Sequence, residues 1–278
     1  MKIIFFGNGD FGIPTLQSIH DSKNNLIALV TNPQKNKGRG LHKKTSNIYN
    51  ASTRINIKIF EEQNITDTFF LETLKALNPD LFIAISYKLM PEELFTIPKY
   101  GTINLHGSLL PEYRGAAPIQ RALMNGDGNI GLTTFYINKR IDCGDILLQK
   151  SFTFNEHTTY TSAHEALSLK AKALVTDTLE LIQSNTTKNK IQSTEKATYA
   201  KKIHKSEYLI NLNYDARVVH NHIRGLTKPG CYCFFTNKRV KLFNTYYVST
   251  DIKTSAVGSF FFKNEYILIK CKTGYLSV

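Results

Sequence analysis

Short apolar runs alternate with segments of helical spacing through the first half of the chain. The runs predict buried strands at residues 2–6, 26–31, 58–60, 81–86 and 102–105. The segments between them predict helices at residues 12–20, 46–53, 67–77 and 91–95. This order of strands and helices predicts an α/β fold with a parallel sheet that is covered by helices on both faces.

The pattern changes after a long helix that is predicted for residues 161–183. Two strands precede this helix, at 131–137 and 145–154, and the polar segment Ser184–Lys196 follows it. Beyond the polar segment, a helix at 215–226 is followed by β-rich runs at 231–236, 239–248, 258–262 and 266–272. We therefore predict a first domain at residues 1–184, a linker at 185–205 and a small β-barrel-like domain at 206–278.

The stretch Gly101–Gly126 is the most informative part of the first domain. Its strand ends in Asn104 and His106, whose side chains point the same way because strand residues alternate between the two faces of a sheet. The carboxyl ends of parallel strands border the crevice in which open α/β sheets bind ligands. Pro118 and Gly126 then mark the start and the end of a helix. We therefore expect Asn104 and His106 to face a ligand site.

Positive charge is concentrated in two regions. The 278 residues carry a formal net charge of +13. Residues 22–60 hold eight Lys/Arg and no Asp or Glu, and residues 201–278 hold thirteen Lys/Arg against four acids. Two basic regions on a slightly acidic body indicate a large polyanionic partner. A genome rich in A and T, which raises Lys and Asn throughout, is the alternative, but it does not explain why acids are missing from two segments only.

The basic segment Pro33–Lys44 combines glycines with five cations. Gly38-Arg39-Gly40 places an arginine on a flexible arm of the kind that reaches a phosphate backbone. A solvated surface loop is the alternative interpretation. We favour a contact with nucleic acid.

Other classes of protein are disfavoured by what the chain lacks. No run of eighteen apolar residues is present, so no membrane span is expected. The apolar start of the chain indicates a first strand rather than a signal peptide. The four cysteines have neither metal-ligand spacing nor a paired framework, which fits a reducing cytosol. His220 and His222 lie two apart in a predicted helix and face apart, so we interpret them as surface or boundary residues.

The glycine-rich turn Gly7–Gly12 matches the pattern GxGxxG between a strand and a helix. A dinucleotide site of this kind also needs an acidic residue about twenty positions later. The second strand instead ends in Val30-Thr31-Asn32-Pro33. We therefore favour a structural turn over a dehydrogenase.

Asn104, His106 and Asp142 form the candidate reactive group. A carboxylate, an imidazole and an amide suffice for acyl transfer to an amine. The attacking α-amino group titrates near about 8 and needs a base. Imidazole and amide groups can donate hydrogen bonds to the oxyanion that forms. A histidine held in the core for structural reasons is the alternative.

At these residues the chain resembles the 10-formyltetrahydrofolate-dependent formyltransferase family, and in particular its members that act on methionyl-tRNA. The resemblance is carried by Asn104–Pro111 (NLHGSLLP), Tyr113–Arg121 (YRGAAPIQR) and Ile141–Asp145 (IDCGD). It extends to Gly38–Gly40 and to Ile223–Gly225 and so covers most of the chain.

The resemblance implies transfer of a formyl group from 10-formyltetrahydrofolate to the α-amino group of methionyl-initiator-tRNA. It implies a Rossmann-like catalytic domain, followed by an OB-like domain that helps to hold tRNA. Asn104, His106 and Asp142 would be catalytic. The folate co-substrate would contact Ser108, Leu109, Leu110 and Pro111, and also Ile85, Tyr87, Leu89 and Met90. The tRNA would contact Lys37, Arg39, Lys43, Lys44 and Arg224. We expect a cytoplasmic monomer that uses no metal and no membrane.

The chain also departs from the family pattern. Cys143 stands where threonine is usual, and the chain has no tryptophan to accompany Pro229. Two rival functions remain open. A sugar-nucleotide N-formyltransferase would share the core and the co-substrate, although the run Ala116–Gln120 and the basic second domain argue against it. A non-enzymatic RNA-binding protein would explain the charge but would leave Asn104 and His106 without a use.

Overall fold

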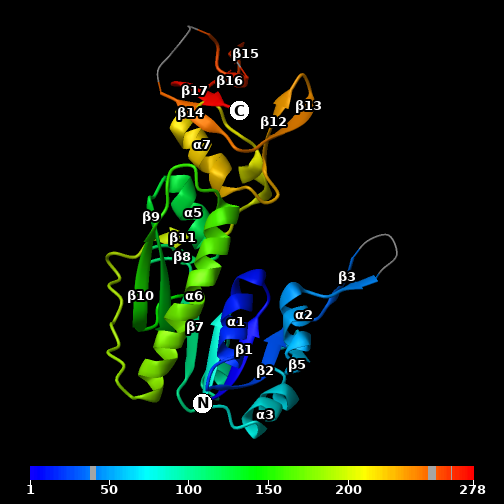
Figure 1. The fold of residues 1–278 in the computed structure, drawn as a ribbon, viewed down its shortest axis with the longest axis vertical. Helices are drawn as coiled ribbons and strands as arrows, with labels where there is room; N and C mark the ends of the chain where they lie inside the picture. Colours follow the sequence, from blue (N-terminus) through cyan, green and yellow to red (C-terminus); the bar gives the residue numbers. More distant parts are fainter. Residues whose placement is uncertain (38–41, 250–254, 264) are drawn as a thin grey trace. The chain divides into compact units, whose positions relative to one another are not determined.

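The structure, a computed structural model, describes residues 1–37, 42–249, 255–263 and 265–278. The chain divides into two compact units, and Figure 1 shows its elements. The first unit comprises Met1–Arg114, Gly131–Lys150 and Glu165–Thr198. The second unit comprises Gly115–Ile130, Ser151–His164 and Tyr199–Val278. Each unit is therefore assembled from segments that are distant in sequence.

A seven-stranded sheet in the order β10-β9-β7-β6-β1-β2-β5 forms the centre of the first unit. Its strands are β1 (Lys2–Gly7), β2 (Asn25–Thr31), β5 (Lys58–Glu61), β6 (Leu81–Ile85), β7 (Thr102–His106), β9 (Asn129–Tyr136) and β10 (Ile146–Thr153). The pairs β1–β2, β2–β5, β1–β6 and β6–β7 are parallel, whereas β9 is antiparallel to β7. The predicted α/β class is confirmed, and the strand order reverses between β1 and β6.

Helices connect and cover these strands. They are α1 (Ile13–His20), α2 (Asn47–Arg54), α3 (Thr68–Ala76), α4 (Glu92–Phe95) and α6 (Tyr160–Gln183), and the short helix η1 (Asp10–Gly12) precedes α1. The side chain of Ser46 accepts a hydrogen bond at the start of α2, and that of Asp67 does so at the start of α3. Ser168 on α6 donates to the carbonyl oxygen of Phe11 at 2.7 Å, which ties the long helix to the turn after β1.

A core of apolar side chains lies between the sheet and the short helices. It joins residues of β1, β2 and β6 to residues of α3 and α4, among them Phe6, Val30, Phe82, Leu74 and Leu94. Burial of each such side chain stabilises the fold by about 1.5–3 kcal/mol relative to exposure. The strands are apolar on both faces because helices cover both, and this pattern is why their positions could be predicted.

The basic segment contains two short strands rather than only the predicted loop. β3 (Lys35–Lys37) and β4 (His42–Lys44) pair antiparallel, with Lys35 opposite Lys44. Arg39, for which the resemblance implies a contact with tRNA, lies outside the described residues. The prediction of a loop is therefore corrected for the backbone, because residues 35–37 and 42–44 pair as the two strands of a hairpin.

The second unit contains helices and antiparallel strands, as predicted. Its elements are α5 (Pro118–Asn125), η2 (Lys205–Tyr208), α7 (Ala216–Gly225), β12 (Cys231–Phe235), β13 (Lys238–Leu242), β14 (Tyr246–Val248), β15 (Phe260–Lys263), β16 (Tyr266–Lys270) and β17 (Tyr275–Ser277). β12 and β13 form one two-stranded sheet, and a second sheet has the order β14-β17-β16-β15. The last strand, β17, was not predicted, although it pairs with both β14 and β16. The two-residue strands β8 (Arg114–Gly115) and β11 (Tyr199–Ala200) form a further small sheet.

His220 on α7 is buried at 2 % exposure, so its interpretation as a surface or boundary residue was wrong. Its Nε2 lies 2.9 Å from the carbonyl oxygen of Glu156, and its Nδ1 lies 3.0 Å from Oγ1 of Thr245. A carbonyl oxygen only accepts, so Nε2 carries the proton. Burial lowers the pKa of His220, which therefore stays neutral inside the second unit.

Candidate active site

Asn104 and His106 lie at the carboxyl end of β7 with their side chains on the same face of the sheet. His106 is 7 % exposed, and Asn104 is half-buried. β7 is flanked by β6 and β9, which hold both residues in register with Ala84, Phe135 and Thr133. No hydrogen bond joins the Asn104 side chain to any described residue. An unpartnered amide beside a buried imidazole is suited to receive a polar ligand.

The ring of His106 is fixed from both sides. Its Nε2 lies 2.8 Å from the carbonyl oxygen of Tyr113, and its Nδ1 lies 3.7 Å from Oδ2 of Asp142. The carbonyl can only accept, so Nε2 carries a proton and Nδ1 is the nitrogen left for chemistry. Nδ1 faces the carboxylate of Asp142, and an imidazole beside a carboxylate is an arrangement used for general acid–base chemistry.

Asp142 sits in a strained turn between β9 and β10. Its backbone has φ 52°, in the left-handed region that most side chains avoid. Two residues later, a Cβ on Gly144 would lie 1.6 Å from the carbonyl oxygen of Tyr136, so only glycine fits. The side chain of Asp142 is only 14 % exposed. Strain of this kind persists only where the surroundings hold the backbone in place.

Gln192 holds this turn, and sequence reasoning missed it. Its Nε2 donates to the carbonyl oxygens of Asp142 and Gly144 at 3.0 and 2.7 Å. Its Oε1 accepts from Nε and Nη2 of Arg114 at 3.1 and 2.7 Å. Gln192 and Arg114 are 7 % and 4 % exposed. This buried brace, the Arg114–Gln192 pair, links the Asp142 turn to the segment whose Tyr113 carbonyl binds His106.

The segment that carries Gln192 is more than a polar linker. Lys190 pairs with Ile146 through two main-chain hydrogen bonds of 2.9 Å. Thr198 accepts from the N–H of Tyr113 through Oγ1 at 2.8 Å and from that of Arg114 through its carbonyl at 2.9 Å. Residues 190–198 are thus held at one end by β10 and at the other by the loop after β7. Their composition carries no signal of these contacts, because the partners lie far away in sequence.

Thr133 on β9 and Gln149 on β10 fasten the loop after β7. Thr133 Oγ1 donates to the carbonyl oxygen of Ser108 at 2.6 Å and accepts from the N–H of Leu110 at 3.1 Å. Gln149 Nε2 donates to the carbonyl oxygen of Leu110 at 2.8 Å. Ser108 Oγ donates to the carbonyl oxygen of Glu112 at 2.6 Å. These contacts fix the main chain on both sides of Leu109, within the loop that the resemblance assigns to the folate site.

The loop also carries two apolar side chains, Leu109, which is half-buried, and Leu110, which is buried. Leu109 packs so closely on Gly131 that a Cβ there would lie 2.3 Å from its side chain. Leu110 is buried at 3 % exposure, and the peptide bond between Leu110 and Pro111 is cis. The loop therefore combines apolar side chains with a well-held backbone next to His106.

The segment after β6 starts at the point where the strand order reverses, the usual place for a ligand in such sheets. Ile85 and Met90 are buried, whereas Leu89 is 63 % exposed. Tyr87 packs its ring 5.3 Å from that of Phe6, and its buried hydroxyl has no partner among the described residues. Burial also raises the pKa of Tyr87. Of the residues in this segment for which the resemblance implies a folate contact, only some are therefore accessible.

No group of three or more His, Cys, Asp or Glu side chains in the described part of the chain is placed to hold a metal ion. Burial raises the pKa of the Cys231 thiol to about 12 and that of Cys271 to about 11, so both remain protonated. None of the described helices is long and apolar enough to cross a membrane.

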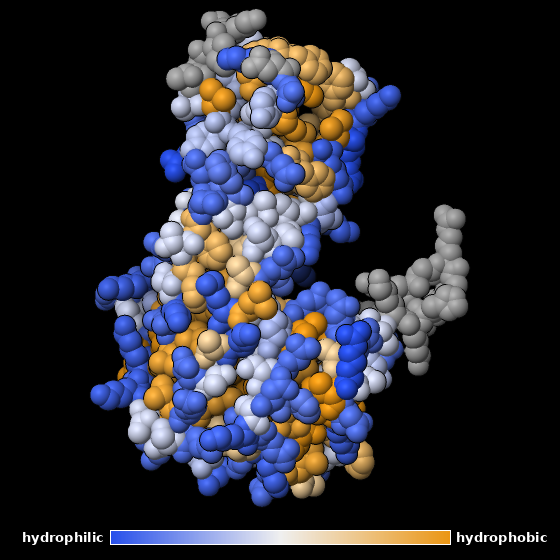
Figure 2. Space-filling model, in the orientation of Figure 1, coloured by the Kyte–Doolittle hydropathy of each residue, from blue (hydrophilic) through white to orange (hydrophobic). Residues whose placement is uncertain are grey.

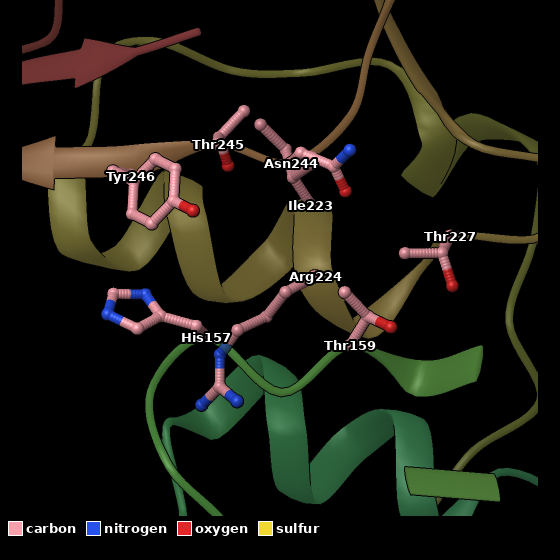
Figure 3. Close-up of a pocket in the computed structure, with 8 residues that line it drawn as sticks. All are labelled: His157, Thr159, Ile223, Arg224, Thr227, Asn244, Thr245 and Tyr246. Atoms are coloured by element: carbon pink, nitrogen blue, oxygen red, sulfur yellow. The ribbon is translucent and has the colours of Figure 1, made fainter. Parts of the chain in front are cut away.

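Arg224 lies in the second unit and lines a cavity of about 90 Å³ (Figure 3). The other lining residues are His157, Thr159, Ile223, Thr227, Asn244, Thr245 and Tyr246. Arg224 is 4 % exposed, and it donates through Nε to Asn221 Oδ1 at 2.8 Å and through Nη1 to the carbonyl oxygen of Thr158 at 3.0 Å. This placement favours a role in holding α7 over the predicted contact with tRNA.

Comparison with known families identifies the class. Residues 1–179 match the family described as formyl transferase, and residues 202–278 match formyl transferase, C-terminal domain. These matches, together with the strand-end site, define the class as the formyl transferases. A methionyl-tRNA formyltransferase from Sulfurihydrogenibium sp. (strain YO3AOP1) is 37% identical over 91% of this chain and 82% of the relative. One from Caldanaerobacter subterraneus subsp. tengcongensis is 33% identical over 100% of this chain and 91% of the relative. The chain belongs to the methionyl-tRNA formyltransferase family, as its motifs predict.

Solved structures share the fold at lower identity. The N-formyltransferase from Helicobacter canadensis, in complex with folinic acid and dTDP-3-aminofucose, has a TM-score of 0.75 and 18% identity over 100% of this chain and 98% of that one. A sugar 3N-formyl transferase, solved with dTDP and 5-N-formyl-THF, has a TM-score of 0.72 and 18% identity over 100% and 96%. At this identity the likeness shows the fold alone.

Proposed function

We propose that this enzyme transfers the formyl group of 10-formyltetrahydrofolate to the α-amino group of methionyl-initiator-tRNA. The observation that carries the proposal is the group at the end of β7. There the Asn104 amide, which has no hydrogen-bond partner among the described residues, shares a face of the sheet with His106, and His106 is paired with Asp142. Its place in a chain of the methionyl-tRNA formyltransferase family supports this acceptor over a sugar amine. The product is formylmethionyl-tRNA, which serves the initiation of translation.

The residues around the strand end fit the folate co-substrate. Leu89 offers an exposed apolar side chain, and the loop Ser108–Pro111, with its main chain held by Thr133, follows His106. An apolar surface with a few fixed polar groups is what a flat heterocyclic ligand needs. The co-substrate, when bound, supplies an electrophilic formyl carbon.

We assign the proton chemistry to His106 and Asp142. Nδ1 of His106, with Asp142 beside it, accepts the proton that the attacking amine loses. The ring then carries a positive charge, and its Nδ1–H and the Asn104 amide donate hydrogen bonds to the negative charge that develops on the formyl oxygen. Nδ1 then returns the proton to the departing folate nitrogen. One proton leaves the amine and one reaches the leaving group, so the transfer is balanced.

The brace formed by Gln192 and Arg114 positions this chemistry. Gln192 holds the Asp142 turn by two carbonyl oxygens, and Arg114 follows the residue whose carbonyl orients His106. The two catalytic side chains are thus fixed through one buried hydrogen-bond network. Gln192 and Arg114 are positioning residues, because neither side chain contacts the reacting atoms in this scheme.

We further propose a separate function for each domain of the chain. Residues 1–184 form the catalytic domain and 206–278 bind tRNA, a division that the separate family matches to 1–179 and 202–278 support. Residues 185–205 join the two, and Gln192 in this segment belongs to the first unit. Lys37, Arg39, Lys43 and Lys44 contact the phosphates of tRNA. The enzyme acts as a monomer in the cytoplasm, where charged tRNA is used for translation.

The direct test is a transfer assay with the full chain. Labelled 10-formyltetrahydrofolate is offered with methionyl-tRNA, with an amino-sugar nucleotide, or with no acceptor. We expect labelled formylmethionyl-tRNA, and no label on the sugar. Transfer to the sugar alone would assign the enzyme to the sugar-nucleotide class. The absence of any transfer, with RNA binding intact, would leave only an RNA-binding protein.

A further inference from the structure

The hairpin of β12 and β13 has two chemically different faces. Residues opposite each other in the hairpin share a face, and faces alternate along each strand. Cys231 and Leu242 form one pair, and both are buried against the core of the second unit. The next pair, Tyr232 and Lys241, therefore points the other way, as does the pair of Phe234 with Arg239.

This outward face, which we call the ribbon face, consists of Tyr232, Phe234, Arg239 and Lys241. Phe234 is 61 % exposed, and Arg239 and Lys241 are exposed as well. In the orientation of Figure 2, apolar and hydrophilic residues lie together over this part of the second unit. Two aromatic rings and two cations on one face form the combination that binds single-stranded nucleic acid.

Charge selects the kind of partner. Residues 228–243 hold four Lys/Arg and no Asp or Glu. A cationic ribbon without a single acid is complementary to a polyanion. A protein partner would need acidic side chains and apolar side chains in the same alternation, whereas a nucleic acid offers both phosphates and flat bases.

The contacts within the ribbon face indicate a different role for each of its four residues. The guanidinium of Arg239 lies 4.4 Å from the centre of the Tyr232 ring, so that ring positions the cation. Tyr232 and Phe234 meet edge to face, with ring centres 5.8 Å apart. The Phe234 ring is thus oriented by its neighbour and remains open to solvent. Lys241 donates to the carbonyl oxygen of Pro229 at 2.6 Å, which ties it to the loop before β12.

We propose that the ribbon face binds unpaired nucleotides of RNA. Phe234 stacks on a base, and Arg239, steadied by Tyr232, contacts the adjoining phosphate. Bases present a flat surface only where they are unpaired, so the face selects single-stranded segments over duplex. The inference deepens the proposed function, on which it rests for the identity of the RNA as the acceptor tRNA.

Binding of a single-stranded RNA of mixed sequence that carries 2-aminopurine tests the proposal with the full chain. We expect Phe234→Ala to weaken binding by roughly 5- to 150-fold, the range that loss of one stacked base gives. Phe234→Tyr should bind as the unaltered chain does, because it keeps an aromatic face. Phe69→Ala is the matched control, since Phe69 is 82 % exposed in the first unit.

The dependence of RNA affinity on salt concentration distinguishes the role of the Phe234 ring from that of the Arg239 cation. Arg239→Gln should reduce the slope of log affinity against log salt concentration by about 0.7, the value of one single-strand phosphate contact. Phe234→Ala should leave this slope unchanged. Lys99→Gln is the control for charge, because Lys99 also lies over a tyrosine ring, at 4.9 Å from that of Tyr100 in the first unit.

Several outcomes would overturn the proposal. Unchanged RNA affinity of Phe234→Ala would do so, as would an equal loss of affinity for a fully paired duplex. A dimer that dissociates in sedimentation when Phe234 is replaced would assign the face to a second copy of the chain. The transfer assay is run in parallel. If the chain formylates methionyl-tRNA but Phe234→Ala leaves RNA affinity unchanged, only the ribbon-face proposal is refuted. If the chain does not formylate methionyl-tRNA but Phe234→Ala weakens RNA binding, only the proposed function is refuted.

Discussion

The site at the end of β7 and the ribbon face of β12–β13 use polar side chains in opposite ways. Around His106 and Asp142, the supporting groups are buried and hydrogen-bonded to main-chain carbonyls. On the ribbon face, Phe234 and Arg239 are exposed, and each contacts the ring of Tyr232 on the same hairpin. Chemistry needs reacting groups held within a fraction of an ångström, whereas stacking on a flexible strand tolerates adjustment.

The difference explains why the two regions respond differently to substitution. A buried network loses its function when one member changes, because the remaining groups are left unpaired and move. A substitution on an exposed surface removes only the interaction of that one side chain. Substitutions at the strand-end site should therefore change kcat, and substitutions on the basic surfaces should change KM or affinity for RNA.

The largest expected effect is at Asn104. Asn104→Ala removes a donor to the oxyanion and should lower kcat by about 10²–10³ with little change in either KM. The thermal midpoint should not fall, because the Asn104 side chain has no hydrogen-bond partner among the described residues. Steady-state kinetics and a melting curve measure both. Full activity of Asn104→Ala would remove this residue from the mechanism.

A smaller but still large loss is expected at Gln192. Gln192→Leu frees the carbonyl oxygens of Asp142 and Gly144, and the shifted turn should lower kcat by about 10- to 100-fold. Ile191→Ser, at the 81 % exposed neighbouring residue, should have no effect. The loss from Gln192→Leu should shrink when Asp142→Asn is already present, because both act through the same carboxylate. Strictly additive losses would show that Gln192 only stabilises the fold.

The basic hairpin of β3 and β4 should alter tRNA kinetics alone. Charge reversal by Lys43→Glu and Lys44→Glu should raise KM for methionyl-tRNA and leave KM for 10-formyltetrahydrofolate unchanged. For each phosphate that the hairpin no longer binds, the salt slope should fall by about 1. Lys23→Glu, an exposed cation in the same basic region of the sequence, is the control. Equal effects of all three reversals would indicate general attraction rather than a defined contact.

The same comparison shows what the sequence can predict. The strands of the first unit were predictable because they are apolar on both faces, and period two placed Asn104 and His106 together. Asp142 was a candidate because it lies in a turn of the same half of the chain, and the resemblance then implied its catalytic role. Its contact with the imidazole of His106 is tertiary, so nothing in the local sequence pattern shows it.

The failures have a common physical cause. Gln192 lies in a segment whose polar composition predicts a linker, and only the folded path shows that its amide has four partner atoms. His220 was interpreted as a surface or boundary residue from its spacing in a helix, yet it is buried with hydrogen-bond partners. Composition reports the average behaviour of a residue type. It does not report burial that hydrogen bonds make possible.

The smallest expected effect is a dependence of stability on pH in the second unit. Burial lowers the pKa of His220 in the folded chain, so the unfolded chain binds its proton more tightly. Stability is therefore present at neutral pH and is lost as the pH falls below the unfolded pKa of about 6.5. The urea midpoint should be lower at about pH 5.5 than at about pH 7.5.

His220→Gln isolates this effect, because it removes the titration and keeps polar atoms near Thr245 and the carbonyl oxygen of Glu156. It should flatten the pH dependence, whereas His20→Gln, at an exposed histidine of α1, should leave it as it was. A midpoint that rises on acidification would mean that His220 is stabilised in its charged form by Glu156. His220 would then be a buried imidazole with a carboxylate partner, as His106 is at the end of β7. The site at the end of β7 and the ribbon face would then differ only in the exposure of their side chains.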